Sequence, residues 1–469
     1  MPIDSPGAAS QHLPWPSVTD AARRRRPLTF EPFRGLRYAP ERVEDLAAVT
    51  APPYDTLDRA GVAALRATDP HNIVRIILPR ATKPTRRPER AAAHDAGYDE
   101  ARDLLARWRG DGVLVVDPEP ALYVYEQVDG RPENRGSPAG VLRGLIGAVE
   151  LRDPDERVVL PHEDVLPGPV QDRLALMRVT RANLEPILLV YQGGGTTTEI
   201  VEAVSATPPM VEAHGPDGTS YRLWRISDPQ RLATIAQDLA PRQSLIADGH
   251  HRYAAYLRLR EEMHAAGAGN GPWDAGLALL VDQRAHPLGI AAIHRTVTGR
   301  TLRDVVDAAS GVFQVEMFGA DGAAARKALA GCAGVAHALI ATDGSQWVLL
   351  RLPHDRAAAF QSTLLASRPL LDTDVLHGLL LGGPLRVAEE AISYVHDERA
   401  VIDAVRDGGG VAFVLNPVDV ATVWTVAGEG GRMPRKSTSF GPKPRTGFVM
   451  RAFDDQTTRS PGPNRPAWG

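Results

Sequence analysis

The sequence predicts a mixed α/β fold, in which strands and helices alternate along most of the chain. Three observations support this prediction. The chain has 469 residues, of which 43% are hydrophobic, so it can bury cores for about two to four domains. Short apolar runs typical of strands alternate with stretches whose apolar residues recur every three or four positions, as on one face of a helix. A strand, a turn and a helix also follow one another directly at residues 244–265.

Composition and stretches rich in glycine and proline divide the chain into five segments. Residues 1–28 are rich in Pro, Ser and Ala and are expected to form a disordered leader. Residues 29–151 form an N-terminal α/β region, and residues 152–299 form a central core. Residues 300–430 form a C-terminal α/β region, and residues 431–469 hold a polar Lys/Ser/Thr loop followed by a Pro-rich tail.

The periodicity of apolar residues predicts the individual elements. In the N-terminal region, apolar runs at residues 73–78 and 141–151 are expected to be strands, and residues 90–109 a helix. In the core we expect a helix at residues 170–181 and a strand at 186–191. Further strands are expected at residues 276–281, 288–294, 411–415 and 421–426.

Charge and composition argue against several classes of function. The 53 basic and 57 acidic residues leave a net charge of −4, which gives no general attraction to nucleic acid or to anionic membranes. With a single cysteine, Cys332, the chain has no intramolecular disulfide and no cysteine-based metal site. It contains neither a run of 18 apolar residues nor an apolar signal core. We therefore expect a cytoplasmic protein that binds neither nucleic acid nor membranes; its oligomeric state stays open.

The segment Asp248-Gly249-His250-His251-Arg252 is the strongest candidate for an active site. It lies between an apolar strand and a helix, so the two histidines and the arginine fall in the first helical turn. A helix N-terminus presents unpaired N–H groups and a partial positive charge, and arginine binds phosphate through two donors at once. The sequence thus predicts a phosphate site. The alternative is that Asp248 only caps the helix and the histidines are ordinary turn residues.

A second candidate is the loop at residues 161–169, where His162, Glu163 and Asp164 stand between prolines and just before a helix. A carboxylate beside a phosphate site can deprotonate a hydroxyl group or hold Mg²⁺. The alternative is ordinary helix-start chemistry, because acidic residues are common near helix N-termini.

The distribution of lysine gives a third signal. Only four of the 53 basic residues are lysines, and two of them, Lys436 and Lys443, fall in one short segment. A lysine in an arginine-rich chain suits a phosphate site that needs a compact, flexible charge. We therefore add Lys436, Lys443 and the neighbouring Ser437 and Thr438 to the candidate nucleotide- or phosphate-binding residues, although chance clustering would give the same pattern.

Two further pairs are candidates for a substrate pocket. Tyr54 and Asp55 follow two prolines that fix the backbone, and His294-Arg295 ends a predicted strand. A rigid structural turn explains the first pair equally well, and a surface turn the second. The chain lacks the glycine loop of P-loop nucleotide-binding proteins, the dinucleotide-binding glycine motif, the zinc-protease motif and the serine-hydrolase elbow.

Taken together, these segments resemble a large bacterial and archaeal family, the domain of unknown function numbered ten-fifteen. The similarity extends from residue 32 almost to residue 451. It is carried by the following segments: Ala51-Pro52-Pro53-Tyr54-Asp55, Asn72-Ile73-Val74-Arg75, Pro161-His162-Glu163, Leu166-Pro167-Gly168-Pro169, Asp172-Arg173-Leu174, Arg181-Ala182-Asn183-Leu184, Ala247-Asp248-Gly249-His250-His251-Arg252-Tyr253, His294-Arg295 and Met433-Pro434-Arg435-Lys436-Ser437-Thr438.

The resemblance implies a ParB/sulfiredoxin-like nucleotide-binding core with N- and C-terminal α/β extensions. In that superfamily a turn of the type Gly-x-His-Arg or Gly-x-x-Arg binds nucleotide phosphates. The segment from Gly249 to Arg252 is similar to this turn. Sulfiredoxin has its catalytic cysteine where this chain has His250, so sulfiredoxin chemistry is excluded. The chain also resembles characterised free-serine kinases of the SerK/SbnI type.

These relatives imply roles for individual residues. Glu163, assisted by His162, would accept the proton of the acceptor hydroxyl, and Asp248 would bind Mg²⁺ or orient His251. The donor would be ADP or ATP, and the acceptor free L-serine or a similar hydroxylated metabolite. The expected function is therefore a nucleotide-dependent small-molecule kinase, a phosphotransferase with an alcohol group as acceptor. The alternative is a non-catalytic, ParB-like nucleotide-binding switch; a DNA-binding module is weaker, because no segment after the leader is clearly basic.

Overall fold

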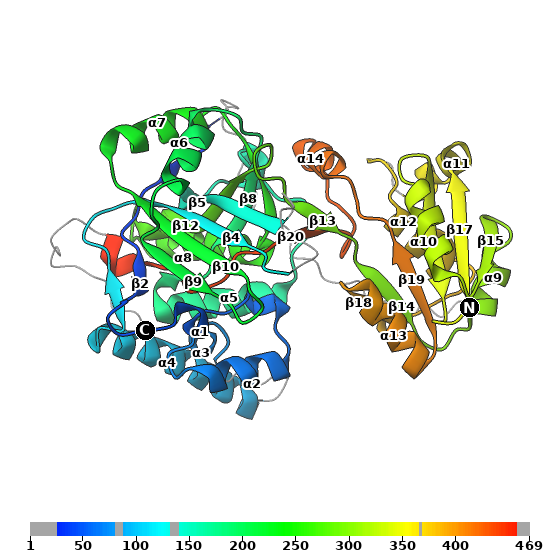
Figure 1. Ribbon diagram of the computed structural model, residues 1–469, viewed down its shortest axis with the longest axis horizontal. Coiled ribbons are helices and arrows are strands. Elements are labelled where there is room, and N and C mark those ends of the chain that lie inside the picture. Colours follow the sequence, from blue (N-terminus) through cyan, green and yellow to red (C-terminus); the bar gives the residue numbers. More distant parts are fainter. Residues whose placement is uncertain (1–25, 80–87, 132–139, 365–367, 457–469) are drawn as a thin grey trace. The chain divides into compact units, whose positions relative to one another are not determined.

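The computed structural model describes residues 26–79, 88–131, 140–364 and 368–456 (Figure 1). The expected disordered leader lies almost wholly outside the described residues, and so does the Pro-rich tail from residue 457 onward. The chain divides into two compact units. Unit 1 comprises Met1–Leu288 and Pro442–Gly469, and unit 2 comprises Gly289–Gly441. Unit 1 is therefore discontinuous in the sequence.

Unit 1 is built on one large mixed sheet. Its strands are β1 (Phe30–Glu31), β4 (Leu122–Val128), β5 (Val141–Glu150), β6 (Val159–Leu160), β8 (Ile187–Tyr191), β9 (Val211–His214), β10 (Ser220–Ile226), β11 (Ser244–Asp248) and β12 (Ala275–Asp282). The order is β6-β11-β8-β12-β5-β4-β10-β9, and β1 pairs with β5 beside this path. The pairs β6–β11 and β8–β12 are parallel, and the other pairs are antiparallel.

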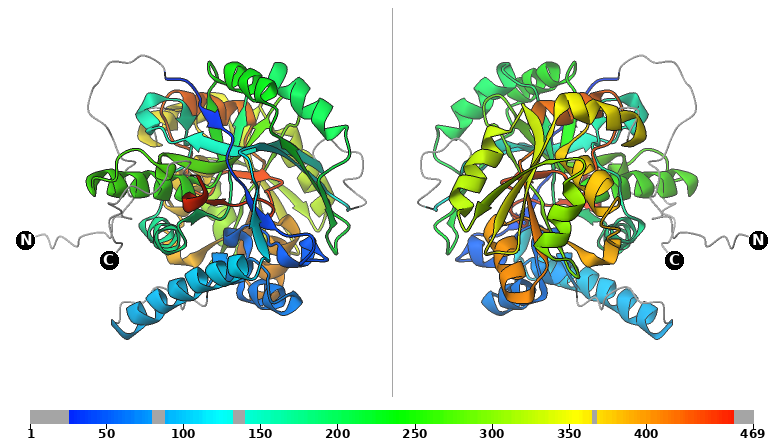
Figure 2. Two further views of the ribbon diagram at one scale, coloured as in Figure 1. Left: turned by 90° about the vertical axis from the view of Figure 1, so that its left-hand side faces the viewer. Right: turned by 90° about the vertical axis from the view of Figure 1, so that its right-hand side faces the viewer.

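Helices and two short strand pairs complete unit 1. The helices are α1 (Leu46–Val49), α2 (Arg59–Thr68), α3 (Val74–Ile77), α4 (Pro88–Gly110), α5 (Pro167–Thr180), α6 (Thr196–Ser205), α7 (Pro229–Leu239) and α8 (His250–Ala265). The strand pairs are β2 (Leu36–Tyr38) with β3 (Leu114–Val116) and β7 (Ala182–Asn183) with β21 (Arg451–Ala452). Helix α5 contacts both α4 and α8, and α6 lies beside α7 (Figures 1 and 2).

Helix α8 is a core helix, which explains why its first turn is held firmly. Ala255, Leu259 and Met263 recur at four-residue spacing and are buried in the main core of unit 1. Tyr253 is also fully buried, and its hydroxyl group accepts a hydrogen bond from the Arg152 amide at 3.0 Å and donates one to the Arg152 carbonyl at 2.7 Å. These contacts satisfy buried backbone groups that would otherwise cost free energy.

Unit 2 contains a six-stranded antiparallel sheet, a separate two-stranded pair and helices. Its strands are β13 (Gly289–Ala291), β14 (His294–Val297), β15 (Gln314–Gly319), β16 (Ala336–Thr342), β17 (Trp347–Pro353), β18 (Ile392–Val395), β19 (Val411–Leu415) and β20 (Ser439–Gly441). The sheet order is β15-β17-β16-β19-β14-β18, and β13 pairs separately with β20. The helices are α9 (Leu302–Ala309), α10 (Gly322–Gly331), α11 (His354–Leu364), α12 (Asp372–Leu376), α13 (Glu398–Gly408) and α14 (Val420–Gly428), with a π-helical turn η6 (His377–Leu381) after α12.

Both faces of the unit 2 sheet are buried at the central strands β16 and β19, whereas the edge strand β15 is largely exposed. Along β16, Leu339 and Ala341 join a core with residues of α9, α11 and α12, whereas Ala338 and Ile340 join a second core with residues of α10 and α13 (Figure 2). Successive residues of a strand point to opposite faces, so helices cover the sheet on each side.

The predicted mixed α/β fold class is confirmed. Strand β5 and helix α8 follow the predicted ranges closely. Two predicted strands are wrong: residues 73–78 contain helix α3, and residues 421–426 lie in helix α14. Both are short apolar runs rich in β-branched residues, and such a run fits a buried helix as well as a buried strand. In the described residues, no helix has both the length and the apolar character needed to cross a membrane.

Candidate functional site

The turn between β11 and α8 has a backbone that requires glycine. Gly249 precedes the helix with φ 96° and ψ 27°, in the left-handed region. A Cβ atom at this position would lie 2.8 Å from Cγ2 of Ile187 on the neighbouring strand β8. Glycine alone fits both constraints without strain, so this residue lets the chain turn sharply from the strand into the helix.

The loop with His162 and Glu163 lies beside this turn, although about 85 residues separate the two in sequence. Strand β6 ends at Leu160 and pairs in parallel with β11, which ends at Asp248. The carboxyl ends of parallel neighbours lie at the same edge of a sheet, which is where ligands bind in open α/β sheets. The sequence predicted both segments separately, and the strand pairing brings them together.

Two histidine rings join the two segments directly. The His162 amide donates to Nε2 of His250 at 3.2 Å, and the Leu166 amide donates to Nε2 of His251 at 3.0 Å. The His162 and His250 rings also pack edge to face, with centroids 4.5 Å apart. An Nε2 atom that accepts a hydrogen bond carries no proton, so each imidazole is assigned the tautomer with its proton on Nδ1. The histidines therefore fix the Glu163 loop against the helix start.

Asp248 is the centre of the charge network in the turn. Its carboxylate is buried and pairs with Arg252, at 2.5 Å, and with the ammonium group of Lys443. Burial opposes ionisation of this carboxyl group, but Lys443 and Arg252 outweigh burial and hold the pKa of Asp248 below its ordinary value. Lys443 also lies 3.5 Å from Asp55, so its ammonium group stands between two carboxylates.

Arg252 connects the turn to Tyr54. One guanidinium nitrogen donates to the Pro186 carbonyl at 2.6 Å, and the guanidinium carbon lies 6.0 Å from the centre of the Tyr54 ring. Arg173 of α5 lies closer to the same ring, at 4.1 Å. Burial, only partly offset by the two arginines, raises the pKa of the Tyr54 hydroxyl above its ordinary value, so this group is neutral at physiological pH.

A buried glutamate ties these parts together. Glu185 accepts hydrogen bonds from the Tyr54 amide at 3.2 Å and from the Thr446 hydroxyl at 3.3 Å, and it lies 3.3 Å from a guanidinium nitrogen of Arg173. Burial raises the pKa of its carboxyl group, although Arg252 and Arg173 act in the opposite direction. Glu185 therefore holds the Tyr54 loop and the C-terminal segment against α5.

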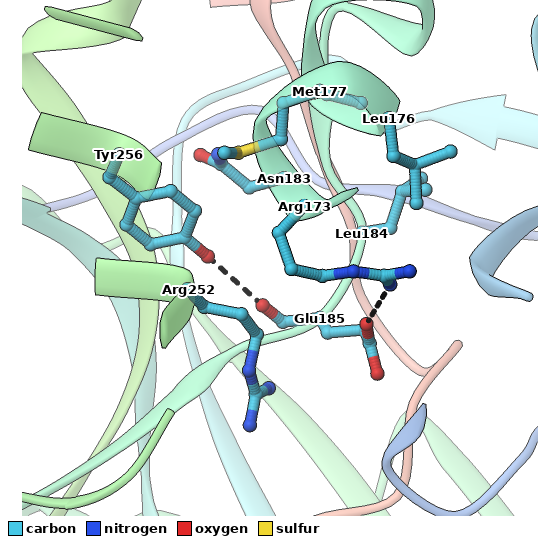
Figure 3. Close-up of a pocket in the computed structure, with 9 residues that line it drawn as sticks. Arg173, Leu176, Met177, Asn183, Leu184, Glu185, Arg252 and Tyr256 are labelled. Carbon is cyan, nitrogen blue, oxygen red and sulfur yellow. Dashed lines mark hydrogen bonds and ion pairs between the residues drawn. The ribbon is translucent and has the colours of Figure 1, made fainter. Parts of the chain in front are cut away.

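A small cavity is lined by residues of α5, of α8 and of the segment 182–185 (Figure 3). Its volume is about 20 Å³, which is room for about one water molecule and far too little for a nucleotide. Nε of Arg252 has no hydrogen-bond partner among the described residues. The cavity is lined by Arg173, Leu176, Met177, Ala182, Asn183, Leu184, Glu185, Arg252 and Tyr256.

Comparison with family models identifies the chain. The model described as "Protein of unknown function (DUF1015)" matches residues 30–373, which is more than half of the sequence. The chain belongs to the DUF1015 family. A comparison with curated proteins found no match.

Among solved structures, this DUF1015 protein is similar to a free serine kinase variant in complex with ADP. The identity is 12% and the TM-score 0.34, over 64% of this chain and 91% of the kinase. It is also similar to C-terminally truncated SbnI from Staphylococcus aureus, at 10% identity and a TM-score of 0.36, over 67% of this chain and 90% of SbnI. A conserved hypothetical protein from Pyrococcus furiosus matches at 13% identity and a TM-score of 0.32, over 64% and 94%.

The candidate residues of the DUF1015 protein are divided between its two units. Unit 1 contains His162, Glu163, Asp248, Gly249, His250, His251, Arg252, Lys443, Tyr54 and Asp55. Unit 2 contains His294, Arg295, Lys436, Ser437 and Thr438. The sequence treated Lys436 and Lys443 as one cluster, but the boundary between the units falls between them.

Sequence reasoning missed Glu185 and Arg173 as members of the network. A signal for each was present: Arg173 lies in the family segment at residues 172–174, and Glu185 directly follows the segment at 181–184. Across the residues that the structure describes, no three His, Cys, Asp or Glu side chains are grouped so that they could hold a metal ion.

Proposed function

We propose that the turn at residues 248–252 binds the phosphates of a nucleotide and that the protein transfers a phosphoryl group to the hydroxyl of free L-serine or a similar metabolite. The observation that carries this proposal is the meeting of the Glu163 loop with the turn, through the parallel pairing of β6 and β11 and the two histidine contacts. This arrangement supports a role for the Glu163 carboxylate beside a helix N-terminus that suits a phosphate.

The residues divide the reaction between them. Glu163 accepts the proton of the acceptor hydroxyl while its oxygen bonds to the terminal phosphorus of ADP or ATP. The bond from that phosphorus to the bridging oxygen breaks, and the shortened nucleotide leaves with the electron pair. The amides of the first helical turn and the cationic groups of Arg252 and Lys443 stabilise the negative charge, which is most of what phosphoryl transfer requires.

The ion pairs of Asp248 have a consequence for nucleotide binding. Arg252 and Lys443 are both engaged with this carboxylate, so a phosphate would compete with Asp248 for them. Mg²⁺ that arrived with the nucleotide would draw most of its ligands from phosphates and water, and it would neutralise the charge that develops. Asp248 would be the protein ligand of the ion, which would displace the Lys443 ammonium group. Asp55 lies on the other side of that ammonium group.

A direct test is to incubate the purified protein with Mg²⁺, ADP or ATP and free serine, and to detect phosphoserine by mass spectrometry. Glu163→Gln should abolish product and leave nucleotide affinity, measured by calorimetry, within about threefold of the wild type. Asp164→Asn is the matched control, because it makes the same change at the exposed neighbouring carboxylate and should keep most of the activity.

Two results would count against the proposal. Tight nucleotide binding without transfer to serine or to any of a panel of hydroxylated metabolites would favour the nucleotide-binding switch. A Glu163→Gln variant that retains full activity would remove Glu163 from the role of base.

A further inference from the structure

Unit 2 contains a buried arginine that forms no ion pair among the described residues. Arg295, on β14, is completely enclosed and is the largest of the fully buried side chains. Its Nε donates to Nε2 of His377 at 3.3 Å, one terminal nitrogen donates to the Ile293 carbonyl, and the other donates to the Lys436 carbonyl at 2.9 Å. A guanidinium has five N–H donors, so two of them have no partner among the described residues.

This arrangement compensates the charge of Arg295 only in part. Tyr394, its partner across β14 and β18, lies with its ring 5.1 Å from the guanidinium carbon. The hydroxyl group of Tyr394 donates to Glu389, which is exposed. Burial lowers the pKa of Arg295 to about 10, with Tyr394 and Glu389 only partly offsetting it, so the group stays charged at neutral pH. A buried cation without an ion-pair partner destabilises the folded protein.

The contacts around Arg295 add other groups that suit a ligand. His377 is the first residue of the π-helical turn η6, a rare conformation that often occurs at functional sites. Burial and the nearby Arg295 lower the pKa of His377 to about 4, which keeps its ring neutral and able to accept from Arg295. The His377 and Tyr394 rings lie nearly parallel, with an interplanar angle of 8° and centroids 6.4 Å apart.

The turn that Arg295 holds is strained and carries a second unpartnered group. Lys436 has φ 56°, a left-handed conformation that is uncommon for a residue with a side chain. The next residue, Ser437, is buried, and its hydroxyl group has no hydrogen-bond partner among the described residues. Arg435 and Lys436 are exposed beside it. Strained backbone and unsatisfied polar groups are typical of binding sites.

We propose that unit 2 has an oxyanion-binding site of its own, centred on Arg295, that takes a phosphate or carboxylate group of a small molecule. The two spare N–H groups of Arg295 and the Ser437 hydroxyl donate to the anion, and Arg435 and Lys436 supply further positive charge at the surface. An oxyanion would pair with the guanidinium through two parallel hydrogen bonds and would compensate the buried charge. This site is independent of the function proposed for unit 1.

Equilibrium dialysis of the full chain against labelled inorganic phosphate tests the proposal. We expect the wild type to bind one more phosphate per chain than Arg295→Met, and Ser437→Ala to weaken this site about fivefold. Phosphate bound in unit 1 contributes equally to each protein and cancels in the difference. Arg351→Met, which removes an exposed arginine of the same unit, is the control and should bind as the wild type does. Competition by malonate distinguishes a carboxylate ligand from a phosphate ligand.

Equal phosphate binding by the wild type and Arg295→Met would overturn the proposal. A structural clamp would then be the role of Arg295, and Arg295→Met should lower the unfolding midpoint to the same extent with and without phosphate. If Arg295→Met does not fold, Arg295→Lys and Ser437→Ala decide the question. Both must bind phosphate more weakly than the wild type, and unchanged binding by both would refute the site.

Discussion

Replacing Gly249 by alanine should destabilise the protein and distort the turn between β11 and α8. The left-handed backbone, with φ 96°, costs an alanine about 1–2 kcal/mol. The new Cβ atom would also lie 2.8 Å from Cγ2 of Ile187 and 3.2 Å from Nε of Arg252, so neighbouring groups must shift. Overpacking of this kind adds about 1–3 kcal/mol. The expected loss is therefore about 2–5 kcal/mol.

The control is Gly110→Ala in the last turn of α4. Nothing lies within 4 Å of a Cβ atom built there, and its φ is not left-handed. This variant should be stabilised by about 0.4–1 kcal/mol, because alanine loses less backbone entropy on folding. Urea unfolding followed by tryptophan fluorescence gives the change in unfolding free energy of each variant, and nucleotide affinity is measured in parallel. The reasoning fails if Gly249→Ala costs less than about 0.5 kcal/mol or if the two variants shift in the same direction.

Two other substitutions test the contacts of the site and its core. Lys443→Met leaves Asp248 with Arg252 alone and should cost about 1–3 kcal/mol at neutral pH, less than a fully buried pair because Lys443 is partly exposed. Since the pKa of Asp248 is lowered and that of Lys443 is raised, this deficit should shrink below about pH 4 and above about pH 10.5 in urea unfolding; a deficit that is constant from pH 3 to 11 would contradict the pairing. Tyr253→Phe removes the hydroxyl group that satisfies the Arg152 amide and carbonyl and should cost about 1–3 kcal/mol; a loss within the error of the midpoint would contradict this role.

The turn at residues 248–252 and the loop at residues 161–169 could each be predicted from the sequence, because neighbouring residues determine the conformation of each. A strand, a glycine and a helix start are visible as a pattern at residues 244–265, and they correspond to β11, Gly249 and α8. The prolines around residues 161–169 marked the neighbouring loop in the same way. The pattern could not show that the loop and the turn lie side by side, because this depends on the pairing of β6 with β11.

Features that depend on tertiary packing were missed or misassigned. Helix α3 resembled a strand in the sequence, because a short run in which Ile73, Val74, Ile76 and Ile77 are buried and only Arg75 is polar does not separate a buried helix from a buried strand. The Asn72 side chain that accepts from the Val74 amide gives only a weak signal for a helix start. Lys436 and Lys443 are near each other in sequence, yet no change in composition between them marks the boundary between the two units.

The return of the chain to unit 1 at Pro442 also sets an order of events during synthesis. Lys443 and Thr446, which pair with Asp248 and Glu185, follow Asp248 by almost 200 residues. At about 5–20 residues per second, a ribosome needs roughly 10–40 s to make this stretch. For that time the nascent unit 1 has its turn and helix, but Asp248 has Arg252 without its second cation, Lys443. We therefore expect early-terminated chains that end before Pro442 to be targets for chaperones and proteases rather than partly active proteins.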